Sequence, residues 1–378
     1  MEQAELDHMD RAFGKARSPE EVFGVFTGTQ GEVLASVRRI FRQMAKIVHP
    51  DVYQGTADFE QAGVLFKQLT HFWEQAQMRI ENGTYGMART AETFTPFLIA
   101  TKSRQYMVER LLERSDLCGS YLGSYRCADE KNRVILKVPL RPDDNDLLAN
   151  EARILRQLCM SDSYEKRRHF VSQLVDAFAY QEQASGIMRQ VNVFSYVEGL
   201  YSLKEVREAY PQGIDPTDMA WIWRRLLVAL EFSHTNAVIH GGVLPTHVLL
   251  HPKQHGVVLT DWSCAVRDPA VTGEYICAIS SAYRLWYPAE VFARGEPTPG
   301  LDISMAARCM IDVLGGDPET RIMPVSVPWQ IQNHLKGCTL PNPQQRPQDA
   351  RLLLRAFDEL IERLWGSKTF HKFTMPER

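Results

Sequence analysis

The sequence predicts an α+β chain in which an all-α helical hairpin precedes a larger unit with two lobes. Two observations lead to this fold class. Apolar residues recur every three or four positions between residues 33 and 80, which is the period of amphipathic helices. From about residue 105 the pattern changes to short strand-like runs, and after residue 199 it becomes mainly helical. At 378 residues the chain is long enough for two or three domains.

The first long predicted helix carries an apolar face and, beside it, a basic one. Its apolar residues are Val33, Val37, Ile40, Phe41, Met44 and Val48. Arg38, Arg42 and Lys46 stand four residues apart, so they share a neighbouring stripe. A second helix is predicted from the three-and-four spacing of Phe59, Ala62, Phe66, Leu69, Trp73, Ala76 and Ile80. The two patterns predict antiparallel helices packed along an apolar seam.

The turn between these helices reads His49-Pro50-Asp51. Two antiparallel helices joined at an exposed His-Pro-Asp, with a basic helix before it, resemble a J-domain, here assigned to residues 1–86. The resemblance implies that the tripeptide and the basic stripe dock on a seventy-kilodalton heat-shock (Hsp70-type) chaperone and trigger its ATP hydrolysis. Pro-Asp alone is an ordinary turn signal. The alternative interpretation is therefore a plain loop between two helices that carry a solvated basic face.

The composition is that of an ordinary globular protein, with 44% hydrophobic and 24% charged residues. The net charge of −3 carries no nucleic-acid signature, so no such partner is expected. The seven cysteines form no Cys-x-x-Cys pair, which indicates neither a zinc site nor a disulfide framework. No apolar run reaches the ~20 residues of a membrane span, and the acidic N-terminus lacks a signal-peptide core. A soluble, cytoplasmic protein with no membrane partner is expected.

Residues 87–104 have weak periodicity and several threonines, and they are predicted to connect the hairpin to the next unit. Strand-like runs then fall near residues 106–113, 121–127, 133–139, 171–180 and 190–196, with a helical run at 147–158. These elements define a small, mostly β lobe over residues 105–199. A larger, mainly helical lobe is assigned to residues 200–378.

Motifs in this second unit follow one another in the order found in protein kinases. They are the strand lysine Lys137, the helix glutamate Glu151, the loop 240–250, Asp261-Trp262-Ser263, Pro288-Ala289-Glu290, Asp302 and Arg346-Pro347. On these residues the chain resembles the bilobal protein kinase fold. The resemblance implies a Lys137–Glu151 ion pair and a metal-binding role for Asp261. It also implies structural roles for Asp302, which heads the helix anchoring the loop, and for Arg346, which pairs with Glu290.

The resemblance fails at the groups that carry the chemistry. Where such kinases have a base, a phosphoryl-stabilising lysine and a metal-binding asparagine, this chain has Gly242, Leu244 and His247. Glycine cannot accept a proton and leucine cannot neutralise a phosphoryl group. Magnesium prefers oxygen ligands, whereas imidazole suits softer metals. No catalytic residue is therefore assigned, and a catalytically impaired kinase-like domain, a pseudokinase, is predicted.

The phosphate-binding loop is also incomplete. Gly123 fits the third glycine of the usual pattern, and Gly119 falls between the first two positions. Because Lys137, Glu151 and Asp261 remain, we expect a nucleotide site for ATP with weak or no magnesium dependence, and no required cofactor. The alternative is that Lys137 and Glu151 form a purely structural ion pair.

These features together predict a J-domain co-chaperone whose kinase-like domain is a regulatory or client-binding scaffold. The expected partners are an Hsp70-type chaperone and an unidentified client or partner protein. The alternative is an active atypical ATP-dependent protein kinase carrying a J-domain, because phosphoryl transfer depends mainly on positioning and electrostatics. A third interpretation makes both modules binding surfaces in a larger assembly.

Overall fold

The computed structural model divides the chain into two compact units, Met1–Thr93 and Phe94–Arg378. It describes residues 6, 9–10, 12–13, 16, 18–56, 58–81, 83–86, 94–115, 117–128, 130–182, 186–280, 282–366 and 372–376. Within this described part, none of the helices combines the length and the apolar character that crossing a membrane requires.

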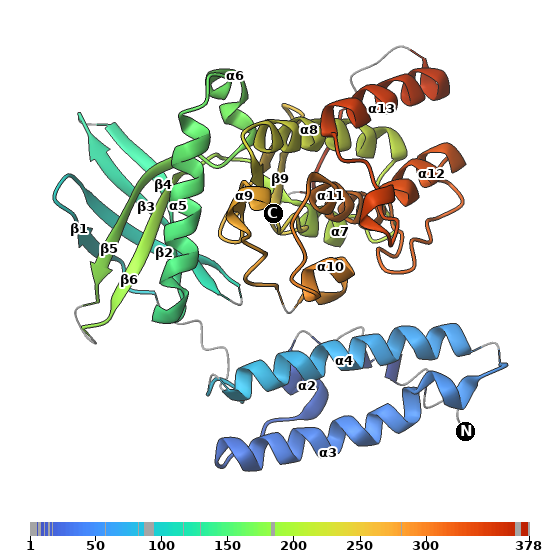
Figure 1. The fold of residues 1–378 in the computed structure, drawn as a ribbon. Helices are drawn as coiled ribbons and strands as arrows, with labels where there is room; N and C mark the ends of the chain where they lie inside the picture. Colours follow the sequence, from blue (N-terminus) through green and yellow to red (C-terminus); the bar gives the residue numbers. More distant parts are fainter. Residues whose placement is uncertain are drawn as a thin grey trace. The chain divides into compact units, whose positions relative to one another are not determined.

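The first unit is helical, as the apolar periodicity predicts. Its described helices are α2 (Pro19–Phe23), α3 (Gln30–Val48), the 3-10 turn η1 (Pro50–Tyr53) and α4 (Phe59–Glu81). Helix α3 begins at a capping box, in which the Glu32 carboxylate accepts from the Thr29 N–H at 2.8 Å and the Thr29 hydroxyl accepts from the Glu32 N–H. The long helices α3 and α4 lie side by side and antiparallel (Figure 1).

The apolar seam predicted between the two long helices forms the core of this unit. Val33, Val37 and Val48 of α3 are buried against Leu65 and Leu69 of α4. Phe41 stacks on Trp73 with 5.0 Å between the ring centroids. Burial of this seam, rather than helix propensity alone, is what stabilises two such helices.

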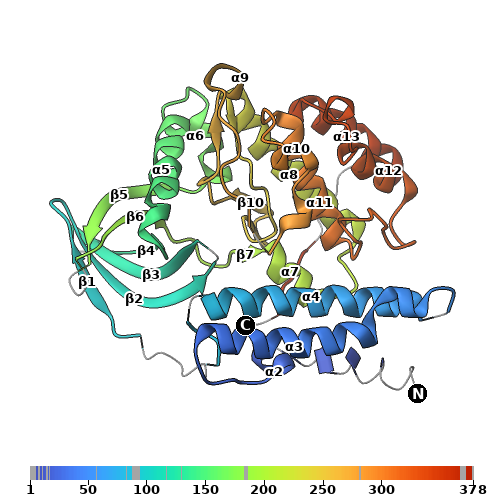
Figure 2. The same cartoon turned by 60° about the horizontal axis from the view of Figure 1, so that its bottom comes forward.

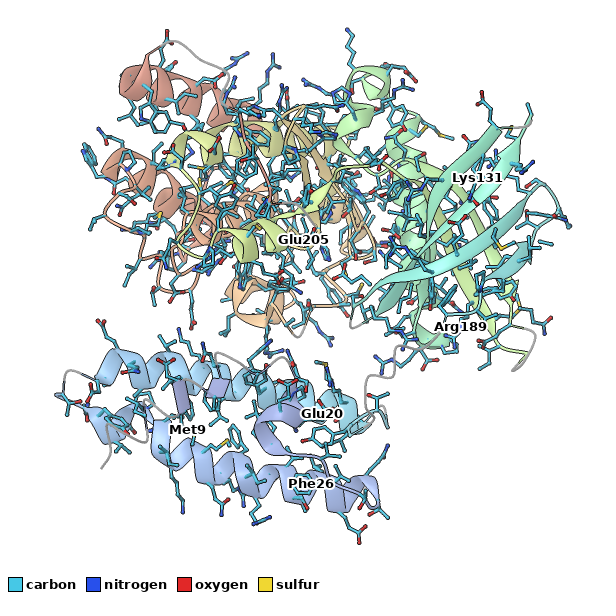
Figure 3. All side chains as sticks on the ribbon, turned by 180° about the vertical axis from the view of Figure 1, so that it is seen from behind. Met9, Glu20, Phe26, Lys131, Arg189 and Glu205 are labelled. Atoms are coloured by element: carbon cyan, nitrogen blue, oxygen red, sulfur yellow. The ribbon has the colours of Figure 1, made fainter. Side chains whose placement is uncertain are left out.

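The far end of the hairpin is closed by polar contacts. The guanidinium of Arg79 on α4 donates to Glu20 on α2 at 2.5 Å, and the Tyr85 hydroxyl donates to the Gly24 carbonyl at 2.7 Å. Glu20 is labelled in Figure 3. These contacts fix α2 against the C-terminal end of α4.

The second unit begins with a curled antiparallel sheet in the order β1-β2-β3-β4-β6-β5. Its strands are β1 (Phe97–Ala100), β2 (Gln105–Arg114), β3 (Cys118–Cys127), β4 (Glu130–Pro139), β5 (Leu174–Gln181) and β6 (Met188–Ser195). Helix α5 (Asn145–Cys159) lies along one face of this sheet (Figure 1). The strands themselves form a core that contains Tyr106, Val134, Leu136 and Val193.

Strand β1 corrects the predicted connector 87–104. Phe97–Ala100 pairs antiparallel with β2, with Ile99 opposite Tyr106 and 2% exposed. The short apolar run therefore belongs to the sheet, because burying Ile99 against the sheet core stabilises it there. Residues 87–93 of the predicted connector lie outside the described residues.

A helical lobe follows, gathered at the opposite end of this unit from the sheet (Figure 2). Its longer helices are α7 (Leu203–Ala209), α8 (Pro216–Thr235), α11 (Pro299–Val313), α12 (Trp329–Cys338) and α13 (Ala350–Trp365). Short helical elements are η2 (Pro142–Asp144), α6 (Tyr164–Arg167), η3 (Arg168–Phe170), α9 (Pro269–Thr272), η4 (Arg284–Trp286), α10 (Ala289–Phe292) and η5 (Pro343–Gln345). Short strands are β7 (Tyr201–Ser202), β8 (Val238–Ile239), β9 (Val248–His251), β10 (Gly256–Leu259) and β11 (Val266–Arg267). The core is built on α8 and α11, with Trp223 and Ile303 fully buried.

Candidate functional site

Three titratable side chains from three elements meet between the sheet and the helical lobe of the second unit. Lys137 extends from β4, Glu151 from α5 and Asp261 from the segment after β10. The Lys137 Nζ lies 3.0 Å from Glu151 Oε1 and 3.0 Å from Asp261 Oδ1. The structure therefore brings together the three residues that the sequence assigns to a nucleotide site.

Burial and mutual attraction oppose each other in this cluster. Burial disfavours the charged ammonium, but Asp261 and Glu151 outweigh it and raise the pKa of Lys137 above its ordinary value. Burial likewise disfavours the Asp261 carboxylate, yet Lys137 and His247 hold the pKa of Asp261 well below its usual range. Lys137 and Asp261 thus form a charged pair at neutral pH.

Glu151 is fixed by donors that the sequence analysis did not single out. Besides Lys137, its carboxylate accepts from the Asn192 side-chain amide at 3.0 Å and from the Trp262 N–H at 3.1 Å. Burial raises the pKa of Glu151, and Lys137 and Asn192 oppose that effect. Asn192 is fully buried in β6 between two apolar residues. In the sequence, this asparagine between two valines was the feature that could have indicated a buried polar contact.

Asp261 is held by its neighbours in the chain and by His247. Its φ is 61°, in the left-handed region that non-glycine residues rarely adopt, and the Ser263 hydroxyl donates to Oδ1. The His247 Nδ1 donates to the Gly242 carbonyl at 2.7 Å, and its Nε2 lies 3.4 Å from Asp261 Oδ2. His247 therefore occupies the side of Asp261 that faces the loop.

The three altered loop positions have distinct surroundings. Leu244 is fully buried in the core of the helical lobe, so it faces no ligand space. A Cβ added to Gly242 would meet only the rings of His247 and His240, at 3.8 Å or more. Within the described part of the chain, no group of three or more metal-binding side chains comes together. The loop thus keeps its shape without a carboxylate base.

Buried polar contacts hold that loop in place. Asp302, fully buried at the start of α11, accepts from the N–H groups of His240 and Gly241, both at 2.8 Å. Burial lowers the pKa of His240 to about 4, so its ring is neutral. The Arg346 guanidinium, 2% exposed, donates to Glu290. These contacts place Asp302, Glu290 and Arg346 in structural positions.

The two glycines predicted to line a phosphate loop lie in one strand. Both Gly119 and Gly123 stand inside β3, which pairs with β2 on one side and β4 on the other. Before β3, the Ser115 N–H donates to the Cys118 carbonyl at 2.8 Å. A Cβ on Gly123 would approach Leu136 Cδ1 to 2.5 Å, so close strand packing requires this glycine. Both glycines lie in a strand, and their assignment to nucleotide binding stays a prediction.

The His49-Pro50-Asp51 tripeptide lies at the tip of the first unit, where α3 ends. The His49 side chain is 43% exposed and that of Asp51 is 81% exposed. The Asp51 N–H donates to His49 Nδ1 at 3.3 Å, and the His49 and Phe66 rings pack edge to face, 4.9 Å between centroids. The buried Tyr53 supports the turn because its hydroxyl donates to the Ile47 carbonyl at 2.9 Å.

The basic stripe on α3 is exposed along the same helix that ends in this tip. Arg38, Arg42 and Lys46 line a shallow hollow on its surface together with Arg39, which the sequence analysis did not include. The Arg38 guanidinium lies over the Trp73 ring of α4, 5.9 Å from its centroid. The stripe and the tripeptide thus belong to one continuous helix and its cap.

Comparison with known proteins supports the fold of the second unit. No family model matches the sequence, and no curated protein matches it. Among solved structures, the kinase domain of Mycobacterium tuberculosis PknI is similar, with a TM-score of 0.50 and 18% sequence identity. The match covers 67% of this chain and 94% of that one. The chain therefore contains a protein-kinase-like fold, and the prediction of that fold is confirmed.

Proposed function

We propose that this chain is a J-domain co-chaperone whose kinase-like unit serves as a scaffold for a client or partner protein. The observation that carries the proposal is the tip of the first unit. An exposed His-Pro-Asp caps a helix whose free face bears a row of cations. A negatively charged groove on an Hsp70-type chaperone would be attracted by that row, and the rigid tip would reach the groove in a fixed orientation.

The geometry of the kinase-like unit supports a role in binding rather than in phosphoryl transfer. Gly242 supplies no base, Leu244 is buried away from any substrate, and His247 lies against Asp261. The same unit keeps a full set of structural contacts around Asp302 and Arg346. A domain that keeps these structural contacts but lacks the reactive groups is expected to act by binding other molecules at its surface.

Single-turnover ATP hydrolysis by an Hsp70-type chaperone tests the first half of the proposal. The full chain should accelerate hydrolysis, and His49→Gln should abolish the acceleration. His71→Gln is the matched control, because His71 is an exposed histidine on α4, away from the tip. Equal acceleration by the unmutated chain and His49→Gln would show that the tripeptide does not dock.

Nucleotide binding is a separate part of the proposal and rests on Lys137 and Asp261. Because Lys137 already neutralises Asp261 at 3.0 Å, ATP should bind weakly and with little dependence on magnesium. At a site with Kd of about 100 µM, millimolar ATP would stabilise the unit by about 1.4 kcal/mol. The ATP-induced shift in melting temperature should vanish in Lys137→Ala. No shift with or without metal would leave the unit a nucleotide-free scaffold.

The intact cluster of Lys137, Glu151 and Asp261 favours one second candidate, an active atypical kinase. Radiolabel transfer with magnesium and with manganese separates the two functions. We expect none, and none after Gly242→Asp, although a Cβ added at Gly242 meets no atom closer than 3.8 Å, because catalytic groups act as a unit. Transfer that the unmutated chain shows and Asp261→Asn loses would establish the kinase instead.

A further inference from the structure

His247, at the end of the loop between β8 and β9, presents one ring nitrogen to Asp261. Its other ring nitrogen, Nδ1, donates to the Gly242 carbonyl at 2.7 Å. Because a carbonyl oxygen only accepts, the proton of the neutral ring lies on Nδ1 and Nε2 carries a free lone pair. Nε2 lies 3.4 Å from Asp261 Oδ2. Two acceptor atoms from two different segments therefore face each other.

The neighbouring donors of Asp261 all approach its other carboxylate oxygen. Lys137 Nζ lies 3.0 Å from Oδ1, and the hydroxyl and N–H of Ser263 also donate to Oδ1. Oδ2 is thus the oxygen that faces His247. The side chains of His247 and Asp261 are 21% and 24% exposed, so an ion from solvent can reach the two facing atoms.

The 3.4 Å between Nε2 and Oδ2 distinguishes the cations that could bridge these atoms. A proton in a charge-assisted hydrogen bond would draw them to about 2.7–2.9 Å. Adjacent ligands of octahedral Mg²⁺, each about 2.0–2.1 Å from the ion, stand about 3 Å apart. Nitrogen and oxygen ligands of tetrahedral Zn²⁺, at about 2.0–2.2 Å, stand about 3.3–3.5 Å apart. The separation matches the tetrahedral ion, and imidazole suits such a metal better than it suits magnesium.

We propose that His247 and Asp261 hold a divalent cation of the zinc class together with the phosphate oxygens of a nucleoside triphosphate. The inference rests on the nucleotide binding proposed for Lys137 and Asp261, because two protein ligands leave two tetrahedral positions for other groups. The Lys137 ammonium beside Asp261 repels a cation, and phosphate oxygens supply the opposing negative charge. Metal and nucleotide therefore bind together, and each raises the affinity for the other by the same factor.

Cobalt is the probe for the metal site, because Co²⁺ replaces Zn²⁺ and absorbs visible light much more strongly in tetrahedral than in octahedral surroundings. The full chain, with its exposed cysteines blocked by N-ethylmaleimide, should show this absorption when Co²⁺ and ATP are added together. His247→Asn and Asp261→Asn should each abolish it. The matched control His251→Asn should keep it, because His251 lies at the far end of the β9–β10 hairpin, opposite Gly256. Absorption that persists in both site variants would overturn the proposal.

The affinity for ATP, obtained from the ATP-induced shift in melting temperature of the full chain, separates the metal site from the nucleotide site. With metal in excess, ATP should bind about tenfold more tightly with Co²⁺ than with Mg²⁺, a difference of about 1.4 kcal/mol. In His247→Asn an amide oxygen replaces the imidazole nitrogen, so the order of the two metals should reverse, whereas His251→Asn should keep it. Equal affinity with the two metals in the unmutated chain would overturn the metal site and leave the nucleotide site standing. Absence of ATP binding with either metal would overturn both.

Discussion

Lys137→Met should destabilise the kinase-like unit far more than the same substitution at Lys131. Both lysines lie on β4 and both pair with a glutamate, at 3.0 Å and 2.9 Å respectively. The Lys137 side chain is 10% exposed, whereas that of Lys131, which is labelled in Figure 3, is 59% exposed. The comparison therefore holds the residue type, the strand and the pair distance constant and varies burial.

The magnitude follows from what each substitution leaves behind. Lys137→Met leaves two carboxylates, Glu151 and Asp261, without their shared cation, and Glu151 is 1% exposed. Breaking a buried ion pair by removing one partner costs about 3–5 kcal/mol, because a buried charge stays uncompensated. At about 2–4 °C per kcal/mol, the melting temperature should fall by about 6–20 °C. Lys131→Met leaves the partly exposed Glu109 and should cost under about 1 kcal/mol.

Differential scanning calorimetry of the full chain measures both effects, since it resolves the transitions of separate units. Urea titration followed by tryptophan fluorescence provides an independent midpoint. Loss of stability in Lys137→Met within about 1 kcal/mol of that in Lys131→Met would refute the reasoning. It would mean that Glu151 and Asp261 are solvated or re-paired once the lysine is gone.

Two further predictions concern His334 and Gly123 of the second unit, and Gly63 of the first unit serves as a comparison. Burial lowers the pKa of His334 to about 4, so the unfolded chain takes up the proton first and stability falls as pH drops from about 6.5 toward 4. In His334→Gln, the new side chain can still accept the hydrogen bond from the Trp223 indole N–H, but it does not titrate. The urea midpoint of this variant should therefore fall less between pH 7 and pH 5 than that of the unmutated chain. An equal fall in the two proteins would contradict the prediction. Gly123→Ala should lower the free energy of unfolding by about 1–3 kcal/mol, because the added methyl group overpacks against Leu136. Gly63→Ala in α4 should raise it by up to about 1 kcal/mol, because a Cβ added there meets no neighbouring atom within 4 Å and alanine favours a helix. Thermal melts that reverse this order would disprove the packing argument.

Local regularities of the sequence determined much of the fold. The period of apolar residues around Val37 and Leu69 predicted two packed helices, because burial of one stripe is a property of each helix by itself. The ordered motifs predicted the kinase-like fold, and the structure brings Lys137, Glu151 and Asp261 within hydrogen-bonding distance. Those motifs are short and keep a fixed order along the chain, so they can be read from the sequence alone.

Pairing between distant segments was decided only by the tertiary structure. Residues 97–100 became a strand because β2 offered a free edge, and Gly123 became a packing position because Leu136 and the Met107 carbonyl lie against it. Nothing in the sequence near Glu151 pointed to Asn192 as its partner. Such contacts depend on which surfaces the folded backbone brings together, and the spacing of residues along the sequence does not indicate which surfaces these are.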